Sequence, residues 1–128
     1  MVLNYAAHDP IIRRAALVMT HGGHGTAMRS LLHGVPMVVI PGLAGDQPYV
    51  GAAVQEFGAG LALPGDASSE VMRAAAQELL AEHSYRDNAK RCSAMLAGVN
   101  GAVNAADEVE YLLAPGKMQS GVRSKQVA

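Results

Sequence analysis

The sequence has no tryptophan, a single phenylalanine and a single cysteine among its 128 residues. The lone cysteine, Cys92, cannot form an internal disulfide, which is typical of a reducing compartment, so we expect a cytoplasmic protein. Charged residues are also scarce, at 16% of the chain, and the formal net charge is -1. This balance argues against a nucleic-acid or membrane-surface partner that is recruited by charge alone.

Long hydrophobic runs and targeting signals are absent as well. No basic segment followed by an apolar run opens the sequence, so we expect no secretory signal. The longest apolar run, residues 35–43, is interrupted by prolines and is far too short to span a bilayer. What the sequence does contain is 50% hydrophobic residues, enough for the packed core of about one domain.

Strand-like and helix-like segments alternate along the chain. Short apolar runs predict buried strands at residues 17–20, 36–41 and 60–63, and residues 2–5 resemble the end of an earlier strand. Helical patterns occupy residues 11–15, 26–33, 47–57, 68–82, 85–96 and 102–114. The alternation predicts an α/β fold: a partial, doubly wound (Rossmann-like) parallel sheet of about three strands with helices on both faces.

Capping residues predict where several of these helices begin. Asp9, followed by Pro10, is expected to cap the first helix, and Asp66 or Ser68 is expected to cap the fourth. Asn100-Gly101 predicts a turn before the last helix. The residues beyond it are polar and rich in glycine, so we expect a domain at residues 1–114 and a disordered tail at 115–128.

The first of two loops at the carboxyl ends of the predicted strands contains three glycines, Gly22, Gly23 and Gly25. Ligands of open α/β sheets bind at such ends, and glycines let the backbone approach them closely. The groups that could hold a phosphate at this helix start are the His21 side chain, the Thr26 hydroxyl and the amides of Gly25, Thr26 and Ala27. A tight strand-to-helix turn without any ligand is the alternative, and the glycine count does not separate the two interpretations.

Two other chemistries are alternatives for this region. His21 and His24 could form a metal pair with His33 or Asp46 as a further ligand, but no cysteine or third close ligand supports it. Ser30 could be a hydrolase nucleophile, yet it lies within a predicted helix without an elbow motif around it. We therefore expect no metal and no bound cofactor.

The second loop ends at Asp46-Gln47, where another helix is predicted to begin. Aspartate as a helix cap is the simplest interpretation of Asp46. The alternative is that both side chains point into the crevice and hold sugar hydroxyls. A carboxylate accepts two hydrogen bonds from a diol, and an amide both donates and accepts, so the pair suits that role.

Taken together, the two loops resemble a known signature. Residues 18–41, VMTHGGHGTAMRSLLHGVPMVVIP, with Gly-Asp-Gln-Pro at 45–48, resemble the donor-binding part of inverting UDP- or dTDP-sugar glycosyltransferases of GT-B architecture. They are most similar to the actinobacterial enzymes that glycosylate macrolides and related natural products, in the erythromycin-type C-terminal domain. The resemblance runs from about His8 to Leu113. It implies the C-terminal half of a GT-B donor domain.

The resemblance implies roles for individual residues. The diphosphate would be bound by His21, Gly22, Gly23, Gly25 and Thr26, the transferred sugar by Asp46 and Gln47, and the base and ribose near His8, Asp9 and Arg29. Many relatives have a ribose-binding glutamate where this chain has Arg29, so the mode of ribose recognition stays open.

The implied reaction is a direct attack of an acceptor hydroxyl on the anomeric carbon, with inversion and without a metal. His21 and the helix start would stabilise the leaving diphosphate. The general base of the family lies in the N-terminal, acceptor-binding domain, which has no counterpart in this chain. We therefore expect no catalytic residue here beyond His21 as leaving-group stabiliser.

The missing parts leave three hypotheses for the chain: a truncated and inactive gene product, a subunit of a split glycosyltransferase, or a non-catalytic nucleoside-diphosphate-binding module. In the usual strand order 3-2-1-4-5-6, the strand at residues 17–20 would lack its inner neighbours. We expect its bare edge to favour pairing with a second copy of the chain.

Overall fold

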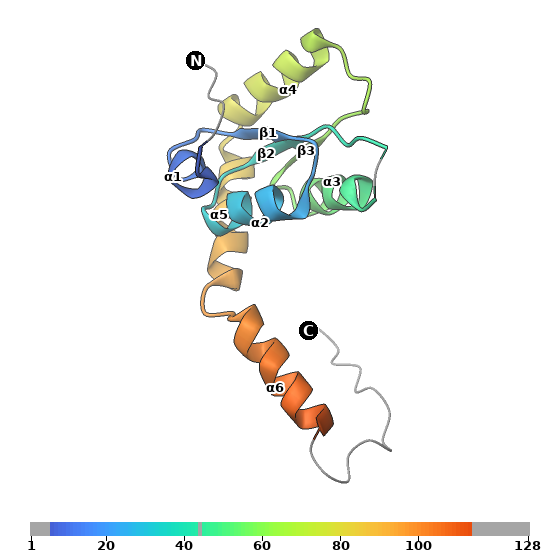
Figure 1. The fold of residues 1–128 in the computed structure, drawn as a ribbon. Coiled ribbons are helices and arrows are strands. Elements are labelled where there is room, and N and C mark those ends of the chain that lie inside the picture. The colour runs from blue at the N-terminus through green and yellow to red at the C-terminus, as the bar shows by residue number, and fades with distance from the viewer. Residues whose placement is uncertain (1–5, 44, 114–128) are drawn as a thin grey trace. The chain divides into compact units, whose positions relative to one another are not determined.

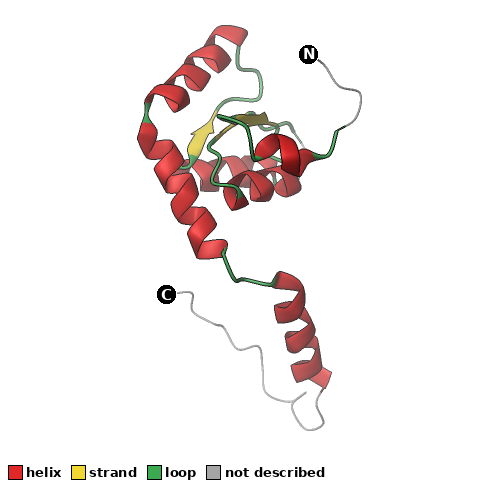
Figure 2. Cartoon of the chain, turned by 90° about the vertical axis from the view of Figure 1, so that its left-hand side faces the viewer, coloured by secondary structure: helices red, strands yellow, loops and turns green. Residues whose placement is uncertain are grey.

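The computed structural model describes residues 6–43 and 45–113, which divide into one unit ending at Ala97 and a second beginning at Gly98. The elements of the first unit are α1 (His8–Ile12), β1 (Val18–Thr20), α2 (His24–Leu32), β2 (Met37–Val39), α3 (Gln47–Glu56), β3 (Gly60–Ala62), α4 (Ser69–Ala81) and α5 (His83–Leu96) (Figures 1 and 2). The second unit contains α6 (Gly101–Leu113). The predicted strand at residues 2–5 and the predicted tail at 115–128 lie outside the described residues.

The three strands form one parallel sheet in the order β1-β2-β3, which confirms the predicted fold class. Val18 pairs with Met37, and Met37 pairs with Gly60, so the carboxyl ends of all three strands lie at one edge. The central strand, β2, has no exposed residue, because its neighbours and the helices cover both of its faces. This burial explains the uninterrupted apolar sequence of β2.

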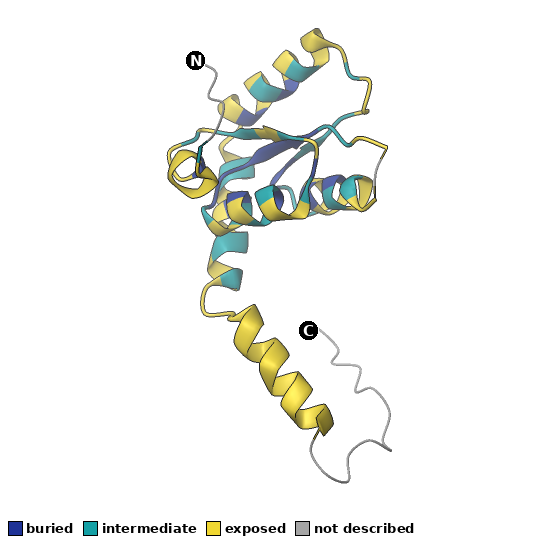
Figure 3. Cartoon of the chain, in the orientation of Figure 1, coloured by how far each residue is buried: buried dark blue, intermediate teal, exposed yellow. Residues whose placement is uncertain are grey.

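Helices cover both faces of the sheet, as predicted. Met37 and Val39 of β2 pack with Ala27 of α2 and Val54 of α3 on one face. Val38 points to the opposite face, where it packs with α4, because successive side chains of a strand alternate. The buried residues therefore concentrate along β2 and the inner sides of the helices (Figure 3).

Side-chain hydrogen bonds fix α4 and α5. The Ser68 hydroxyl accepts a hydrogen bond from the Val71 amide at 3.4 Å, so Ser68 and not Asp66 caps α4. The Tyr85 hydroxyl of α5 donates to Glu78 of α4 at 2.6 Å, and this bond, with burial and the nearby carboxylates, raises the pKa of Tyr85 to about 12. Ser93 of α5 donates to the Leu32 carbonyl at 2.7 Å, which ties α5 to the end of α2.

Three predicted helix starts were wrong, including that of α5, which begins at His83 and not at residue 85. The cap residue of α1 is Ala7, in extended conformation, and Asp9 lies inside this short helix. The helix predicted from Thr26 begins two residues earlier, at His24, with Gly23 as its cap residue.

β1 is an edge strand of the described sheet. It pairs with β2 only, and Met19 in its middle is 44% exposed. The bare edge expected from the sequence is therefore present in the described part of the chain. Pairing of this edge with a second copy of the chain stays a prediction.

The second unit consists of one described helix whose residues are all exposed. Asn100, which was predicted to form a turn with Gly101, directly precedes this helix, and its side-chain oxygen accepts a hydrogen bond from the Val103 amide at 3.2 Å. Apolar residues of this helix, including Val103 and Val109, are exposed. Within the described ranges, no helix is long and apolar enough to cross a membrane.

Candidate functional site

The loops that follow β1 and β2 contact each other at the carboxyl edge of the sheet. Gly22 has a φ of +88°, and a Cβ built on it would lie 2.9 Å from Val39 Cγ1 and 3.1 Å from the Gln47 carbonyl oxygen. The amide of Gly22 also donates to Thr20 Oγ1 at 3.3 Å. Only glycine fits this conformation and this spacing, so Gly22 is the residue that lets the first loop approach the second.

The first turn of α2 presents free backbone donors at this edge. The amides of Thr26 and Ala27 both donate to the Gly23 carbonyl at 3.1 Å, so they are not free, contrary to the prediction. The amide of Gly25 is free, as predicted, and the amide of His24 is free as well, because the helix begins two residues earlier than predicted; neither donates to a described residue. They lie at the positive end of the helix dipole, where an anion is stabilised.

Space for a ligand lies next to these donors. A Cβ built on Gly25 would meet no atom within 4 Å beyond its own stretch of helix, so this glycine faces open space. At Gly23, a Cβ would lie 2.9 Å from His21 Nε2, which places the exposed His21 imidazole over the start of α2. His21 makes no hydrogen bond or ion pair with any described residue, so its ring nitrogen can bind a ligand. The role of these residues as diphosphate ligands stays a prediction.

The second loop is closed by a side chain. Gln47 Oε1 accepts a hydrogen bond from the Gly42 amide at 2.8 Å, which leaves the Gln47 amide group for a ligand. Asp46 occupies the cap position of α3, but its side chain makes no capping hydrogen bond. The carboxylate of Asp46 is thus exposed at the carboxyl edge of the sheet and has no structural partner among the described residues. The prediction that it contacts a sugar is untested.

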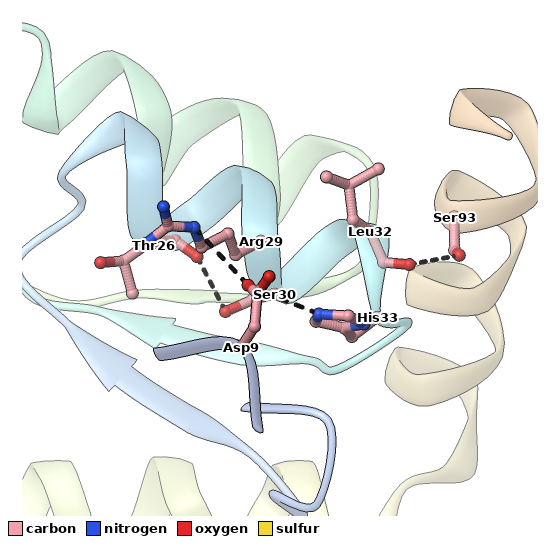
Figure 4. A network of polar contacts seen from close by, with 7 residues as sticks. All are labelled: Asp9, Thr26, Arg29, Ser30, Leu32, His33 and Ser93. Carbon is pink, nitrogen blue, oxygen red and sulfur yellow. Dashed lines mark hydrogen bonds and ion pairs between the residues drawn. The ribbon is translucent and has the colours of Figure 1, made fainter. Parts of the chain in front are cut away.

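A third group of polar residues lies between α1 and α2. Asp9 Oδ1 is 3.6 Å from Arg29 Nε and 3.6 Å from His33 Nε2, and Figure 4 shows the three side chains converging. Ala6, Ala7, His8, Asp9 and Arg29 line a cavity of about 370 Å³. The structure therefore brings together the three residues that the resemblance implied for the base and ribose.

The two alternative chemistries find no support in the geometry. No group of three or more histidine, cysteine, aspartate or glutamate side chains in residues 6–43 and 45–113 is placed to hold a metal. His33 faces Asp9 and lies at the opposite end of α2 from His24. Ser30 is fully buried, and its hydroxyl donates to the Thr26 carbonyl at 3.0 Å, which is a structural bond within the helix (Figure 4).

Two features of the site region were missed from the sequence. His33 joins Arg29 in contacting Asp9, and the signal was its spacing of four residues from Arg29 on one helix. An apolar cavity of about 240 Å³ lies between α2, α3 and α5, lined among others by Met28, Leu31, Phe57 and Cys92. Burial raises the pKa of the Cys92 thiol, which makes it a poor nucleophile.

Similarity to known proteins extends over nearly the whole described chain. Residues 6–110 match the family model of the erythromycin biosynthesis protein CIII-like C-terminal domain. The chain is 34% identical over 110 residues to the uncharacterized UDP-glucosyltransferase YojK of Bacillus subtilis, and 31% identical over 118 residues to the demethyllactenocin mycarosyltransferase of Streptomyces fradiae. These matches cover 85% and 90% of this chain but 27% and 25% of the relatives' lengths.

A solved structure gives the same result for the fold. The glycosyltransferase of kitacinnamycin is similar with a TM-score of 0.75 and 30% sequence identity. The match covers 84% of this chain and 28% of that protein. The fold described above therefore corresponds to about a quarter of each relative's length.

Proposed function

The chain belongs to the family of erythromycin biosynthesis protein CIII-like C-terminal domains, and we propose that it binds the diphosphate of a nucleotide-sugar donor, a UDP- or dTDP-sugar. The observation that carries this proposal is the start of α2. The amides of His24 and Gly25 are free, Gly25 faces open space, and His21 lies over the same turn. A diphosphate would receive hydrogen bonds from these groups and would be stabilised by the helix dipole.

The transferred sugar would lie over the second loop. Asp46 has a free carboxylate there, and Gln47 has a free amide group beside its bond to Gly42. The packing of Gly22 against Gln47 supports this arrangement, because it fixes the distance between the diphosphate loop and the sugar loop. Hydrogen bonds from hydroxyls to Asp46 would orient the anomeric carbon for attack.

The reaction we propose for the complete enzyme is transfer of a hexose to a hydroxyl group of a small-molecule or lipid acceptor with inversion. Charge develops on the leaving diphosphate in the transition state, where His21 and the free amides of α2 would stabilise it. Deprotonation of the acceptor requires a general base, which we assign to an acceptor-binding part outside this chain. The relatives are about four times longer than their match to this chain, which supports a separate acceptor-binding part.

Calorimetric titration of the whole chain with UDP and with dTDP tests the proposal. We expect saturable binding of at least one nucleotide, and about tenfold weaker binding by the His21→Ala variant, because a hydrogen bond to a charged group is lost. His83→Ala is the matched control, since His83 is also exposed but lies at the start of α5. A folded chain that binds neither nucleotide would contradict the proposal.

We also propose that the open edge of β1 pairs with a strand of a second copy when no other strand is available. Sedimentation velocity at increasing protein concentration is the measurement. We expect self-association that weakens in a Met19→Lys variant, because a charge on an exposed strand opposes pairing. A chain that stays monomeric at every concentration would rule this pairing out.

A further inference from the structure

We propose that Thr20 is a positioning residue for the diphosphate site: its hydroxyl group holds the turn that places the His21 imidazole over the start of α2. The inference rests on the proposed function, because it takes His21 to bind the diphosphate. It gives a role in ligand binding to a side chain that acts through its neighbour, at the last position of β1.

The Thr20 side chain closes a short turn after β1. Its Oγ1 accepts a hydrogen bond from the Gly22 amide, two residues farther along the chain, at 3.3 Å. The Thr20 carbonyl accepts a hydrogen bond from the Ile40 amide at 2.8 Å, so the residue itself is fixed to the sheet beside β2. Because a β-branched side chain has few rotamers, the direction of its hydroxyl is restricted. Thr20 therefore joins the sheet to the backbone that follows His21.

The segment that this bond holds has little stiffness of its own. His21 is followed by Gly22 and Gly23, and glycine has more backbone freedom than any other residue. Gly22 is nevertheless held at a φ of +88° against the second loop, with its amide bound to Thr20. The backbone is thus fixed on both sides of His21, which reduces the entropy that the imidazole loses when a ligand binds.

The imidazole is the part of the site that depends on this turn. A Cβ built on Gly23 would lie 2.9 Å from His21 Nε2, so the ring lies over the backbone at the start of α2. The free amides of His24 and Gly25 belong to α2 itself, and the hydrogen bonds of that helix hold them. Loss of the Thr20 hydroxyl would therefore displace His21 and leave those amides in place.

Calorimetric titration of the whole chain with UDP tests this in Thr20→Val, which keeps the shape of the side chain and removes the hydroxyl. We expect about fivefold weaker binding, a smaller effect than removal of the imidazole itself. Thr20→Ser keeps the acceptor oxygen and should bind within about twofold of the unmodified chain. Ser68→Ala is the matched control, since it removes another hydroxyl that accepts a local amide, at the start of α4, and should leave the affinity unchanged.

A double-mutant cycle shows whether Thr20 acts through His21. In the His21→Ala chain, the further change Thr20→Val should weaken UDP binding less than about 1.5-fold, because the group that Thr20 positions is already absent. An effect as large as in the unmodified background would overturn the inference, since Thr20 would then act on the ligand or on the amides without His21.

The outcomes separate this inference from the proposed function. If the unmodified chain binds UDP and Thr20→Val binds it equally well, or if Thr20→Ser binds as weakly as Thr20→Val, the positioning role is overturned while diphosphate binding stands. If the folded, unmodified chain binds neither UDP nor dTDP, the proposed function fails and this inference fails with it. Thermal melting checks that each variant is folded; valine favours strands as threonine does, and Thr20→Ala removes the same hydroxyl if the valine variant is unstable.

Discussion

The two loops at the carboxyl edge of the sheet are held in different ways. The loop after β1 is fixed by backbone packing, since Gly22 fits closely against Val39 and the backbone of Gln47. The loop after β2 is fixed by one side-chain hydrogen bond, from the Gly42 amide to Gln47. Backbone amides cannot rotate away from a ligand. The first loop is therefore suited to the diphosphate, which is the part that all nucleotide-sugar donors have in common. Side chains can be exchanged with little change of fold, so the second loop is suited to the variable sugar.

The glycines of the first loop also differ from one another in how closely they are packed. Gly22 has a positive φ and no room for a side chain, whereas a Cβ built on Gly25 would meet no atom within 4 Å. The same residue type therefore serves the fold at one position and, in our proposal, the ligand at the other. Each of the following predictions separates a folding role from a binding role in one of the two loops.

The largest effect is expected from Gly22→Ala. The new Cβ would adopt an unfavourable φ and approach Val39 Cγ1 to 2.9 Å, so we expect the free energy of unfolding to fall by about 3 kcal/mol. Urea denaturation measures this change. A loss below about 0.5 kcal/mol, which is the ordinary range for a surface substitution, would show that the two loops are not packed as described.

Gly25→Ala should weaken ligand binding without reducing stability. We expect stability to be unchanged or to rise by up to about 1 kcal/mol, because alanine favours helix more than glycine does. UDP binding should weaken about tenfold, since the methyl group would occupy the space of a phosphate oxygen beside the free amides. Binding that is equal to that of the unmodified chain would place the phosphates elsewhere.

Gln47→Ala removes the bond that closes the second loop. We expect a loss of about 1 kcal/mol in the free energy of unfolding, the usual contribution of one hydrogen bond. Gln47→Glu is the matched control, because it keeps an acceptor oxygen for the Gly42 amide. Equal losses in both variants would mean that another property of Gln47 stabilises the loop.

The smallest effect on stability is expected from Asp46→Ala. Its side chain makes no capping bond, so unfolding should change by less than about 0.5 kcal/mol, whereas Ser68→Ala, which removes an observed cap, should cost about 1 kcal/mol. Titration with UDP and with UDP-glucose should show that the variant loses affinity for the nucleotide sugar only. If both ligands lose affinity equally, Asp46 does not contact the sugar.

Much of the fold could be predicted because its signals are local. The apolar run of β2 predicted a strand buried on both faces, and the alternation of strands and helices predicted the parallel sheet. Ser68 was one of two predicted caps and is the observed one. Asp9 was misjudged because its sequence context favours a cap, while its contacts with α2 depend on how α1 packs.

The sequence predicted which loops form the candidate site, but not every backbone amide that is free in them. The first loop was identified from its glycines and Gly25 was among the predicted donors, yet the second free amide is that of His24 and not that of Thr26 or Ala27, because α2 begins two residues earlier than predicted. The amphipathic patterns that predicted helices at residues 85–96 and 102–114 were limited in the same way, because they predicted the helices but not their packing partners. The stripe of α5 buries Ala89, whereas that of α6 has no buried residue, and the pattern alone does not say what covers a helix.

By itself, the sequence determined the fold class, the order of the elements and the two loops that hold the candidate site, because hydrophobic periodicity and glycine positions act over a few residues. Only the tertiary structure decided which glycine is packed and which is open, that Gln47 closes the second loop, and that Asp9 faces Arg29 and His33 beside a cavity. These relations join residues that are distant along the chain, and their distances follow from the packing of helices on the sheet, which no local pattern encodes.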